Sequence, residues 1–438
     1  MMYYSTNGQA PVADLRKAVV KGLAEDKGLY MPQTIKTLPK VFYDEIHNLT
    51  FQDIAYNVAS AFFGEDVDGD ALQDIVYDTL SFDCPVVKVT DNIYSLELFH
   101  GPTLAFKDVG ARFMARLLRY FTQSTLNNQS NPINVLVATS GDTGSAVANG
   151  FLGVEGIHVY VLYPKGKVSP IQECQFTTLG KNITAIEVDG VFDDCQALVK
   201  SAFMDEALNQ HMKLTSANSI NVARFLPQAF YYFYAYAQMK RQGLTNRPLV
   251  VCVPSGNFGN ICAGLFAKRM GLPIERFIAA NNANSVFYEY LQTGEYNPRP
   301  SIQTIANAMD VGAPSNFARV YDLYNKDYEA IRQDISGATY SDAQIADTMR
   351  EVYQQTGYVC DPHGACGYRA LAEGLRADEM GVFLETAHPA KFKTTVDNIL
   401  GTDIDIPAKL QAFMKGTKQS VPMTKAFDDF KAYLMQQP

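Results

Sequence analysis

The chain has 438 residues, of which 47% are hydrophobic and 19% charged, as expected of a globular protein with a large core. Its formal net charge of -9 argues against a nucleic-acid partner, and no apolar run approaches the ~20 residues that span a bilayer. The seven Cys form no CxxC pair and the six His are scattered, so neither a disulfide framework nor a metal site is predicted. We expect a reducing, cytoplasmic environment, because the first eight residues also lack the pattern of a secretory signal.

The first 85 residues show helical periodicity and few strand patterns. The expected helices cover 12–24, 51–63 and 71–80. Further along, short apolar runs alternate with helical patterns. Strands are predicted at 133–138, 159–162, 183–188, 249–253, 277–280 and 382–384, and helices at 145–151, 193–209 and 230–237. The proline-bearing stretch 291–317 is predicted to be irregular, and a helical tail from Pro407 is expected to break at Pro422.

This alternation predicts an α/β protein with mostly parallel sheets covered by helices on both faces. We expect three consecutive parts. They are a mostly helical region at 1–85, an α/β lobe at 86–215 and a second α/β lobe with the tail at 216–438.

Two segments that join a predicted strand to a helix could bind an anion, because ligands lie beyond the carboxyl ends of strands in such sheets. The first contains Ser140, Gly141, Asp142 and Thr143, and an ordinary helix N-cap explains it equally well. The second contains Gly256, Asn257, Phe258, Gly259 and Asn260. Its spacing is neither the GxGxxG fingerprint nor a P-loop, and a tight turn is the alternative.

Three further positions indicate chemistry only when they are considered together with the other segments. Lys107 follows a Gly-Pro turn, and a lysine is a nucleophile only where its amine is neutral and accessible. Thr386 follows a strand-like run, where a structural threonine is the usual case. Arg224 stands with Asn218, Ser219 and Asn221, a set of donors for a phosphate or carboxylate. A surface Arg at an Asn-rich helix start is the competing interpretation.

Together these segments resemble the long-form threonine synthases of bacteria and fungi, which belong to the fold type II pyridoxal-phosphate enzymes. The matching stretches are KGLAEDKGLYMP (21–32), HGPTLAFKD (100–108), TSGDTGSA (139–146), YPKGKVSPIQ (163–172), NSINVAR (218–224), VPSGNFGN (253–260), NAMDVGAPSN (307–316) and TAHPAKF (386–392). The lysine and glycine-loop motifs are shared with other enzymes of this fold, whereas NSINVAR, NAMDVGAPSN and TAHPAKF are more specific. The resemblance implies a two-lobed architecture similar to the tryptophan synthase β subunit.

The resemblance also implies a cofactor, pyridoxal 5'-phosphate, bound as a Schiff base to Lys107. The cofactor phosphate would be held by the amides of Gly256, Asn257, Phe258 and Gly259, with Asn260 opening the next helix, and Thr386 would face the ring nitrogen. Substrate would contact Ser140, Gly141, Asp142, Thr143, Asn218, Ser219, Asn221 and Arg224. Asp142 departs from relatives with Asn there, and a carboxylate beside the cofactor's phenolic oxygen is repulsive unless one of them holds a proton.

The implied reaction converts O-phospho-L-homoserine and water into L-threonine and phosphate, the last step of threonine biosynthesis. Lys107 would move the protons at Cα and Cβ. The expected partner is this small molecule, with neither nucleic acid nor membrane, and the expected state is a monomer or homodimer. A serine or threonine dehydratase is the alternative, because it would share Lys107 and the glycine loop. A dehydratase would not need an Arg-lined phosphate site.

Overall fold

The computed structural model describes residues 1–123 and 132–437, which form two compact units. The glycine-loop unit consists of 1–2, 31–106 and 225–405. The lysine unit consists of 3–30, 107–224 and 406–437, as far as these are described. The three consecutive parts expected from the sequence stay a prediction; each compact unit is assembled from segments that are far apart in the chain.

The glycine-loop unit contains a six-stranded sheet in the order β12-β11-β10-β13-β5-β4. Its strands are β4 (Val86–Lys88), β5 (Ile93–Glu97), β10 (Leu249–Pro254), β11 (Arg276–Asn281), β12 (Ile335–Thr339) and β13 (Met380–Glu385). All neighbours are parallel except β4 and β5. The three strands predicted here are confirmed as β10, β11 and β13, which are almost wholly buried, whereas β4, β5 and β12 were not predicted.

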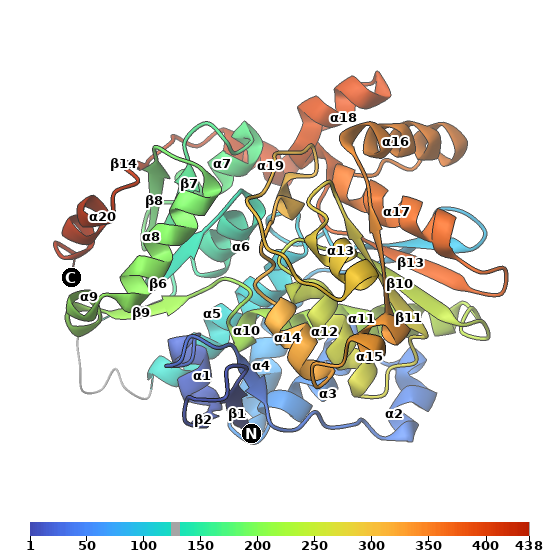
Figure 1. Ribbon diagram of the computed structural model, residues 1–438, viewed down its shortest axis with the longest axis horizontal. Coiled ribbons are helices and arrows are strands. Elements are labelled where there is room, and N and C mark those ends of the chain that lie inside the picture. The colour runs from blue at the N-terminus through green and yellow to red at the C-terminus, as the bar shows by residue number, and fades with distance from the viewer. Residues whose placement is uncertain (124–131, 438) are drawn as a thin grey trace. The chain divides into compact units, whose positions relative to one another are not determined.

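Helices cover both faces of this sheet (Figure 1). On one face α17 (Pro362–Gly374) packs in an apolar cluster with Cys252 and Phe383. On the other, α11 (Ala229–Arg241) and α12 (Gly259–Arg269) pack on Phe277. The remaining helices of this unit are α2 (Lys40–Glu45), η1 (Ile46–Asn48), α3 (Phe51–Phe63), α4 (Gly69–Thr79), η2 (Leu226–Gln228), α13 (Val286–Thr293), η3 (Asn307–Met309), α14 (Phe317–Leu323), α15 (Tyr328–Asp334), α16 (Asp342–Thr356), η4 (Pro389–Phe392) and α18 (Lys393–Leu400).

The lysine unit contains a five-stranded parallel sheet in the order β14-β8-β7-β6-β9. Its strands are β6 (Ile133–Ala138), β7 (Ile157–Pro164), β8 (Ile183–Val188), β9 (Lys213–Ser216) and β14 (Val421–Met423). Alternate side chains such as Leu136 and Leu162 face α8 (Phe192–Met204) and α20 (Phe427–Leu434), while Val161 faces α6 (Asp142–Gly150) on the opposite side. The other helices are α1 (Leu15–Lys21), α5 (Lys107–Gln123), α7 (Pro170–Thr177), α9 (Glu206–His211), α10 (Val222–Phe225) and α19 (Ala408–Met414).

Several sequence predictions of local structure need correction. The helix expected at 193–209 divides into α8 and α9, because the Asp205 carboxylate accepts the Leu208 amide at 2.9 Å and starts a new helix. The tail expected from Pro407 is helical in α19 and α20, on either side of Pro422, but the first helix already ends at Met414, before Pro422. Pro422 lies in β14 at the sheet edge, where the missing N–H of a proline is tolerated. The helices expected at 51–63 and 71–80 are confirmed, whereas the one expected at 12–24 covers only Leu15–Lys21. The short strands β1 (Met2–Ser5), β2 (Ala13–Asp14) and β3 (Tyr30–Pro32) were not predicted.

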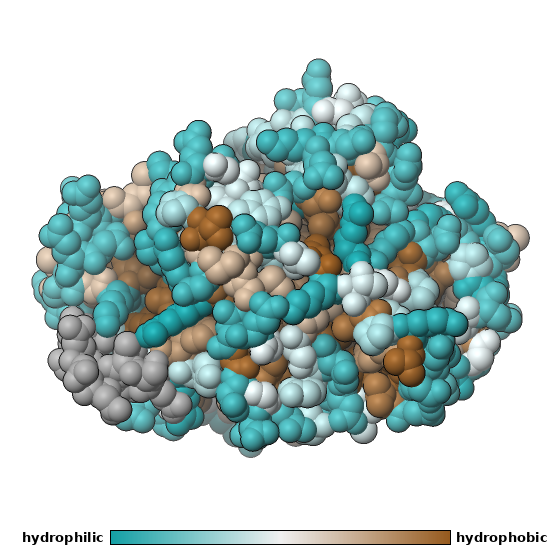
Figure 2. All heavy atoms as spheres, turned by 90° about the horizontal axis from the view of Figure 1, so that it is seen from below, coloured by the Kyte–Doolittle hydropathy of each residue, from teal (hydrophilic) through white to brown (hydrophobic). Residues whose placement is uncertain are grey.

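Among the described residues no helix combines the length and apolar character that crossing a membrane requires. Figure 2 shows a face on which hydrophilic side chains predominate and apolar ones lie between them. The seven cysteines are all free thiols, and six of them are buried.

Candidate active site

The predicted site residues fall in both compact units, so each half is considered by itself. In the glycine-loop unit, the turn at 256–260 links β10 to α12. Phe258 adopts a left-handed conformation with φ 65°, and its ring packs 4.5 Å from that of Phe287. Gly256 lies against the segment around η3, because a Cβ there would stand 2.5 Å from the Ala308 carbonyl oxygen. Only glycine fits this close approach.

The polar groups of this turn fit a bound phosphate. Within residues 1–123 and 132–437, the backbone amides of 256–259 donate no hydrogen bond. The side chain of Asn260 is held on one side only: Oδ1 accepts from the hydroxyls of Tyr231 at 2.8 Å and Tyr232 at 2.7 Å, while buried Nδ2 meets no acceptor among the described residues. Unpaired N–H groups at the start of a helix favour an anion.

Thr386 lies directly after β13 and is buried. Its carbonyl accepts the amide of Phe106 at 2.8 Å, and the neighbouring His388 amide donates to the Leu104 carbonyl at 3.0 Å. Lys391, also buried, donates Nζ to the Thr103 carbonyl at 2.8 Å. The TAHPAKF segment therefore fixes the loop that immediately precedes Lys107 in the chain.

In this segment His388 is a neutral acceptor. Burial, with the neighbouring His100, lowers the pKa of His388 to about 4, and its Nδ1 accepts the Ala390 amide at 3.1 Å. Nearby, burial and the Asp361 carboxylate raise the pKa of Glu385 well above its usual range.

In the lysine unit, Lys107 is the first residue of α5 and is half-buried. Its carbonyl oxygen accepts from Nη1 of Arg224 at 3.1 Å, and Nε of Arg224 donates to the Ala217 carbonyl at 2.7 Å. Arg224 is buried and close to Gly110, where an added Cβ would stand 2.3 Å from the Arg224 carbonyl. The structure thus gives Arg224 an anchoring contact with Lys107 that its sequence motif does not indicate.

The neighbouring donors of the NSINVAR segment are largely engaged with the backbone. Asn221 Nδ2 donates to the carbonyls of Val19 at 2.9 Å and Ser216 at 3.2 Å, and its Oδ1 accepts the Ala223 amide. Asn218 donates to the Ala138 carbonyl at 3.2 Å, at the end of β6. These two asparagines shape the segment that carries Ser219 and Arg224.

The turn at 140–143 begins α6 from the end of β6. Gly141 has φ 144° and ψ -82°, a conformation that side chains rarely allow. The Thr139 hydroxyl accepts the amides of Gly141 at 2.9 Å and Gly144 at 2.8 Å. Asp142 is buried and accepts from Nε2 of Gln172, in α7, at 2.9 Å. Gln172 lies within the quoted YPKGKVSPIQ motif, but nothing in its spacing marked it as a partner of Asp142.

Three comparisons with known proteins bear on this site. Family models match the chain for pyridoxal-phosphate dependent enzymes over 85–384, for the threonine synthase N terminus over 2–80 and for the threonine synthase C-terminal part over 364–434. A threonine synthase from Serratia marcescens is 43% identical over 441 aligned residues, covering 100% of both chains.

Two solved structures match along the whole chain. The crystal structure of threonine synthase from Escherichia coli has a TM-score of 0.93 and 41% identity, and covers 100% of both chains. A threonine synthase from Brucella melitensis with bound PLP has a TM-score of 0.91 and 34% identity, and covers 99% of each. The two terminal family models are specific to threonine synthase, whereas the central model describes pyridoxal-phosphate dependent enzymes in general.

Proposed function

We propose, for a chain that belongs to the threonine synthase family of pyridoxal-phosphate-dependent enzymes, that it converts O-phospho-L-homoserine and water into L-threonine and phosphate. The observation that carries this proposal is similarity over the entire length: a threonine synthase 43% identical across both whole chains. The dehydratase alternative does not explain the matches at the two ends of the chain.

Pyridoxal phosphate supplies, when bound, an electron sink that makes protons on the substrate carbons removable. The amides of 256–259 would hold the cofactor phosphate, and the hydroxyl of Thr386 would lie at the ring nitrogen. Support for the first role comes from the amides themselves, which have no acceptor within the described residues. The hydroxyl is neutral, so it does not enforce a charge on that nitrogen as a carboxylate does.

The substrate is held by the lysine unit in this proposal. Lys107 would take the proton from Cα and then from Cβ, and phosphate would leave from Cγ. Protons would return to Cγ and Cα, and water would add at Cβ. Ser219 and Arg224 bind the substrate phosphate, with Asn218 and Asn221 shaping their segment. Ser140, Gly141, Asp142 and Thr143 bind the substrate carboxylate and the cofactor edge. Gln172 moderates the charge of Asp142 by donating to it.

The test is to measure phosphate and threonine released from O-phospho-L-homoserine by the purified protein with pyridoxal phosphate. Equal amounts of both products are expected. Lys107→Ala should lower kcat by on the order of 10³-fold or more, whereas the exposed Lys425→Ala should leave it unchanged. Borohydride reduction should attach the cofactor to the peptide that carries Lys107. Release of ammonia from serine or threonine without phosphate chemistry would instead favour a dehydratase.

The expected partner is the small-molecule substrate. As finer proposals, the enzyme works as a monomer or homodimer and acts in the cytoplasm, where its free thiols stay reduced. Sedimentation of the holoenzyme distinguishes the two assembly states, and fractionation of cells tests the location.

A further inference from the structure

A buried carboxylate–imidazole pair lies outside the residues assigned above. Asp361 is the N-cap of α17: its Oδ1 accepts the amide of Gly364 at 2.9 Å and also the amide of His363. The imidazole Nδ1 of His363 lies 3.1 Å from the same oxygen. Asp361 is 0% exposed and His363 2% exposed, so neither side chain contacts solvent appreciably.

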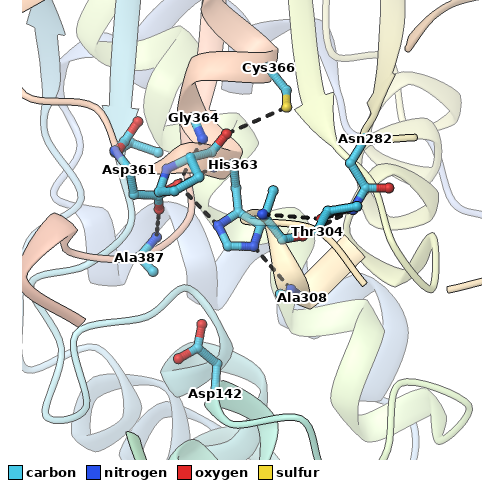
Figure 3. A network of polar contacts seen from close by, with 12 residues as sticks. Asp142, Asn282, Thr304, Ala308, Asp361, His363, Gly364, Cys366 and Ala387 are labelled. Atoms are coloured by element: carbon cyan, nitrogen blue, oxygen red, sulfur yellow. Dashed lines mark hydrogen bonds and ion pairs between the residues drawn. The ribbon is translucent and has the colours of Figure 1, made fainter. Parts of the chain in front are cut away.

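The contacts fix the protonation of this imidazole. Nε2 of His363 lies 3.1 Å from the backbone nitrogen of Ala308. A backbone amide can only donate, so Nε2 is the acceptor and carries no proton. The ring proton therefore resides on Nδ1 and is donated to Asp361 (Figure 3). The imidazole acts as a neutral link with one donor and one acceptor side.

Each end of this link reaches a segment of the proposed cofactor site. At one end, Oδ2 of Asp361 accepts the amide of Ala387 at 3.2 Å, directly after Thr386. At the other, the carbonyl of Ala308 supports Gly256, where it stands 2.5 Å from the place of a Cβ. All of these residues belong to the glycine-loop unit. One pair of side chains thus connects the support of the phosphate loop with the strand end that bears Thr386.

The segment that carries Ala308 has a second, independent support. Asn282, at the end of β11, donates Nδ2 to the Ala306 carbonyl at 3.1 Å, to Asp310 Oδ1 at 2.9 Å and to Thr304 Oγ1 at 2.8 Å. Loss of the imidazole should therefore move Ala308 without unfolding the segment. This separation makes the role of His363 measurable in a folded protein.

We propose that Asp361 and His363 are positioning residues for the cofactor. They hold the phosphate loop at Gly256 and the strand end at Thr386 in a fixed position relative to each other. This inference rests on the proposed function, because it takes 256–259 and Thr386 as cofactor contacts. Neither side chain touches the reacting atoms in this proposal. Their effect is exerted through the backbone of Ala308 and of Ala387.

Two substitutions of His363 test the acceptor Nε2 and the donor Nδ1 of the imidazole separately. In His363→Gln, the side-chain carbonyl can take the place of Nε2 and accept the Ala308 amide. In His363→Asn, the shorter side chain can replace Nδ1 and donate to Asp361 but cannot reach Ala308. His158→Gln is a matched control, because that half-buried imidazole bonds Thr184 within the sheet of the lysine unit.

The measurements are the dissociation constant of pyridoxal phosphate from the reconstituted apoenzyme and the phosphorus NMR shift of the bound cofactor. We expect His363→Asn to weaken binding about tenfold and to change the phosphorus shift, and His363→Gln to restore both toward wild type. The His158→Gln control should match wild type. Far-UV circular dichroism verifies that each variant is folded.

Equal affinity and an equal phosphorus shift in the Asn and Gln variants would overturn the positioning role. If His363→Asn does not fold, His363→Gln decides: wild-type binding supports the proposal, and binding weakened as much as in His363→Leu contradicts it. A wild-type protein that takes up no pyridoxal phosphate would instead disprove the proposed function itself. The two failures are therefore distinguishable.

Discussion

The turn from β10 to α12 and the turn from β6 to α6 both leave a buried parallel strand and enter a helix, yet their polar groups are used differently. At the first turn, the amides of 256–259 donate to no described residue, and a nearby backbone segment supports Gly256. At the second, the Thr139 hydroxyl accepts the amides of Gly141 and of Gly144 in the first turn of α6, and the side chain of Gln172 packs on Gly141.

The contrast shows two ways in which a turn between a parallel strand and a helix can form a ligand site. A turn whose amides stay unpaired can bind a multiply charged phosphate with its backbone. A turn with amides that its own chain already accepts, such as those of Gly141 and Gly144, can present side chains to a ligand, here those of Ser140, Asp142 and Thr143. The first should respond to changes of backbone position, and the second to changes of side-chain charge.

The largest expected effect is that of Gly256→Ala. The new Cβ would stand 2.5 Å from the Ala308 carbonyl, so either the loop or its support must move. We expect affinity for pyridoxal phosphate to fall roughly 100-fold, because the amides lose their common orientation. Gly69→Ala in α4 is the control, since its Cβ would make an ordinary 3.5 Å contact. Unchanged affinity measured by fluorescence titration would refute a backbone phosphate site.

A charge change should act most strongly on the second turn. Gln172→Glu would set a carboxylate against the buried Asp142, in place of the amide that now donates to it at 2.9 Å. We expect the free energy of unfolding to fall by about 2.5 kcal/mol in urea titration, because two like charges share a buried site. The double variant that combines Gln172→Glu with Asp142→Asn should recover most of this loss, because it exchanges the amide and the carboxylate between the two positions. Additive losses would show that the two side chains do not interact.

The sequence predicted most of the buried strands, because runs such as 133–138 and 249–253 are largely apolar, but it missed β5, in which the buried Ser95 interrupts the apolar pattern. It did not predict β12, whose small residues are mostly half-exposed, or β14, which contains Pro422. Both lie at sheet edges and owe their strand conformation to a neighbouring strand.

The residues of the site also fall into those that the sequence predicted and those that it did not. The motifs named Lys107 and the glycine loop by resemblance, but they could not name supports that depend on contacts between distant residues. His363 and Ala308 lie 55 residues apart, and Asp361 and Ala387 lie 26 apart. The only local pattern was Asp before Pro at a helix start, which indicates an N-cap and nothing about a cofactor.

The tyrosines behind the first turn provide a smaller and more precise test. Tyr232 is fully buried, which raises its pKa well above the usual range, and its hydroxyl lies 2.7 Å from Oδ1 and 3.0 Å from the carbonyl of Asn260. Tyr231 lies 2.8 Å from Oδ1 of Asn260 and makes a longer contact of 3.4 Å with Oε1 of Gln228. We expect Tyr232→Phe to lower the free energy of unfolding by about 2 kcal/mol and Tyr231→Phe by about 1 kcal/mol. The reverse order in urea titration would contradict the assigned network.

The smallest expected effect is a pH dependence of the free energy of unfolding. It arises in the segment that supports the first turn. Burial raises the pKa of Asp310, in the segment that carries Ala308, to about 6. The folded chain then retains a proton that the unfolded chain releases from about pH 4, so the free energy of unfolding should fall as the pH rises from about 4 to 6. Below and above this window the contribution is constant.

Partial exposure of Asp310 limits the expected fall to about 1 kcal/mol. Asp310→Asn should remove it, whereas the exposed Asp378→Asn should retain the wild-type slope between pH 4 and 6. The comparison uses differences between variants, because other carboxyl groups titrate in the same range. Gln172, which supports the second turn, does not titrate, so the same pH change should leave the contact between Gln172 and Gly141 intact. A wild-type slope in Asp310→Asn would show that the support of the first turn carries no titrating charge.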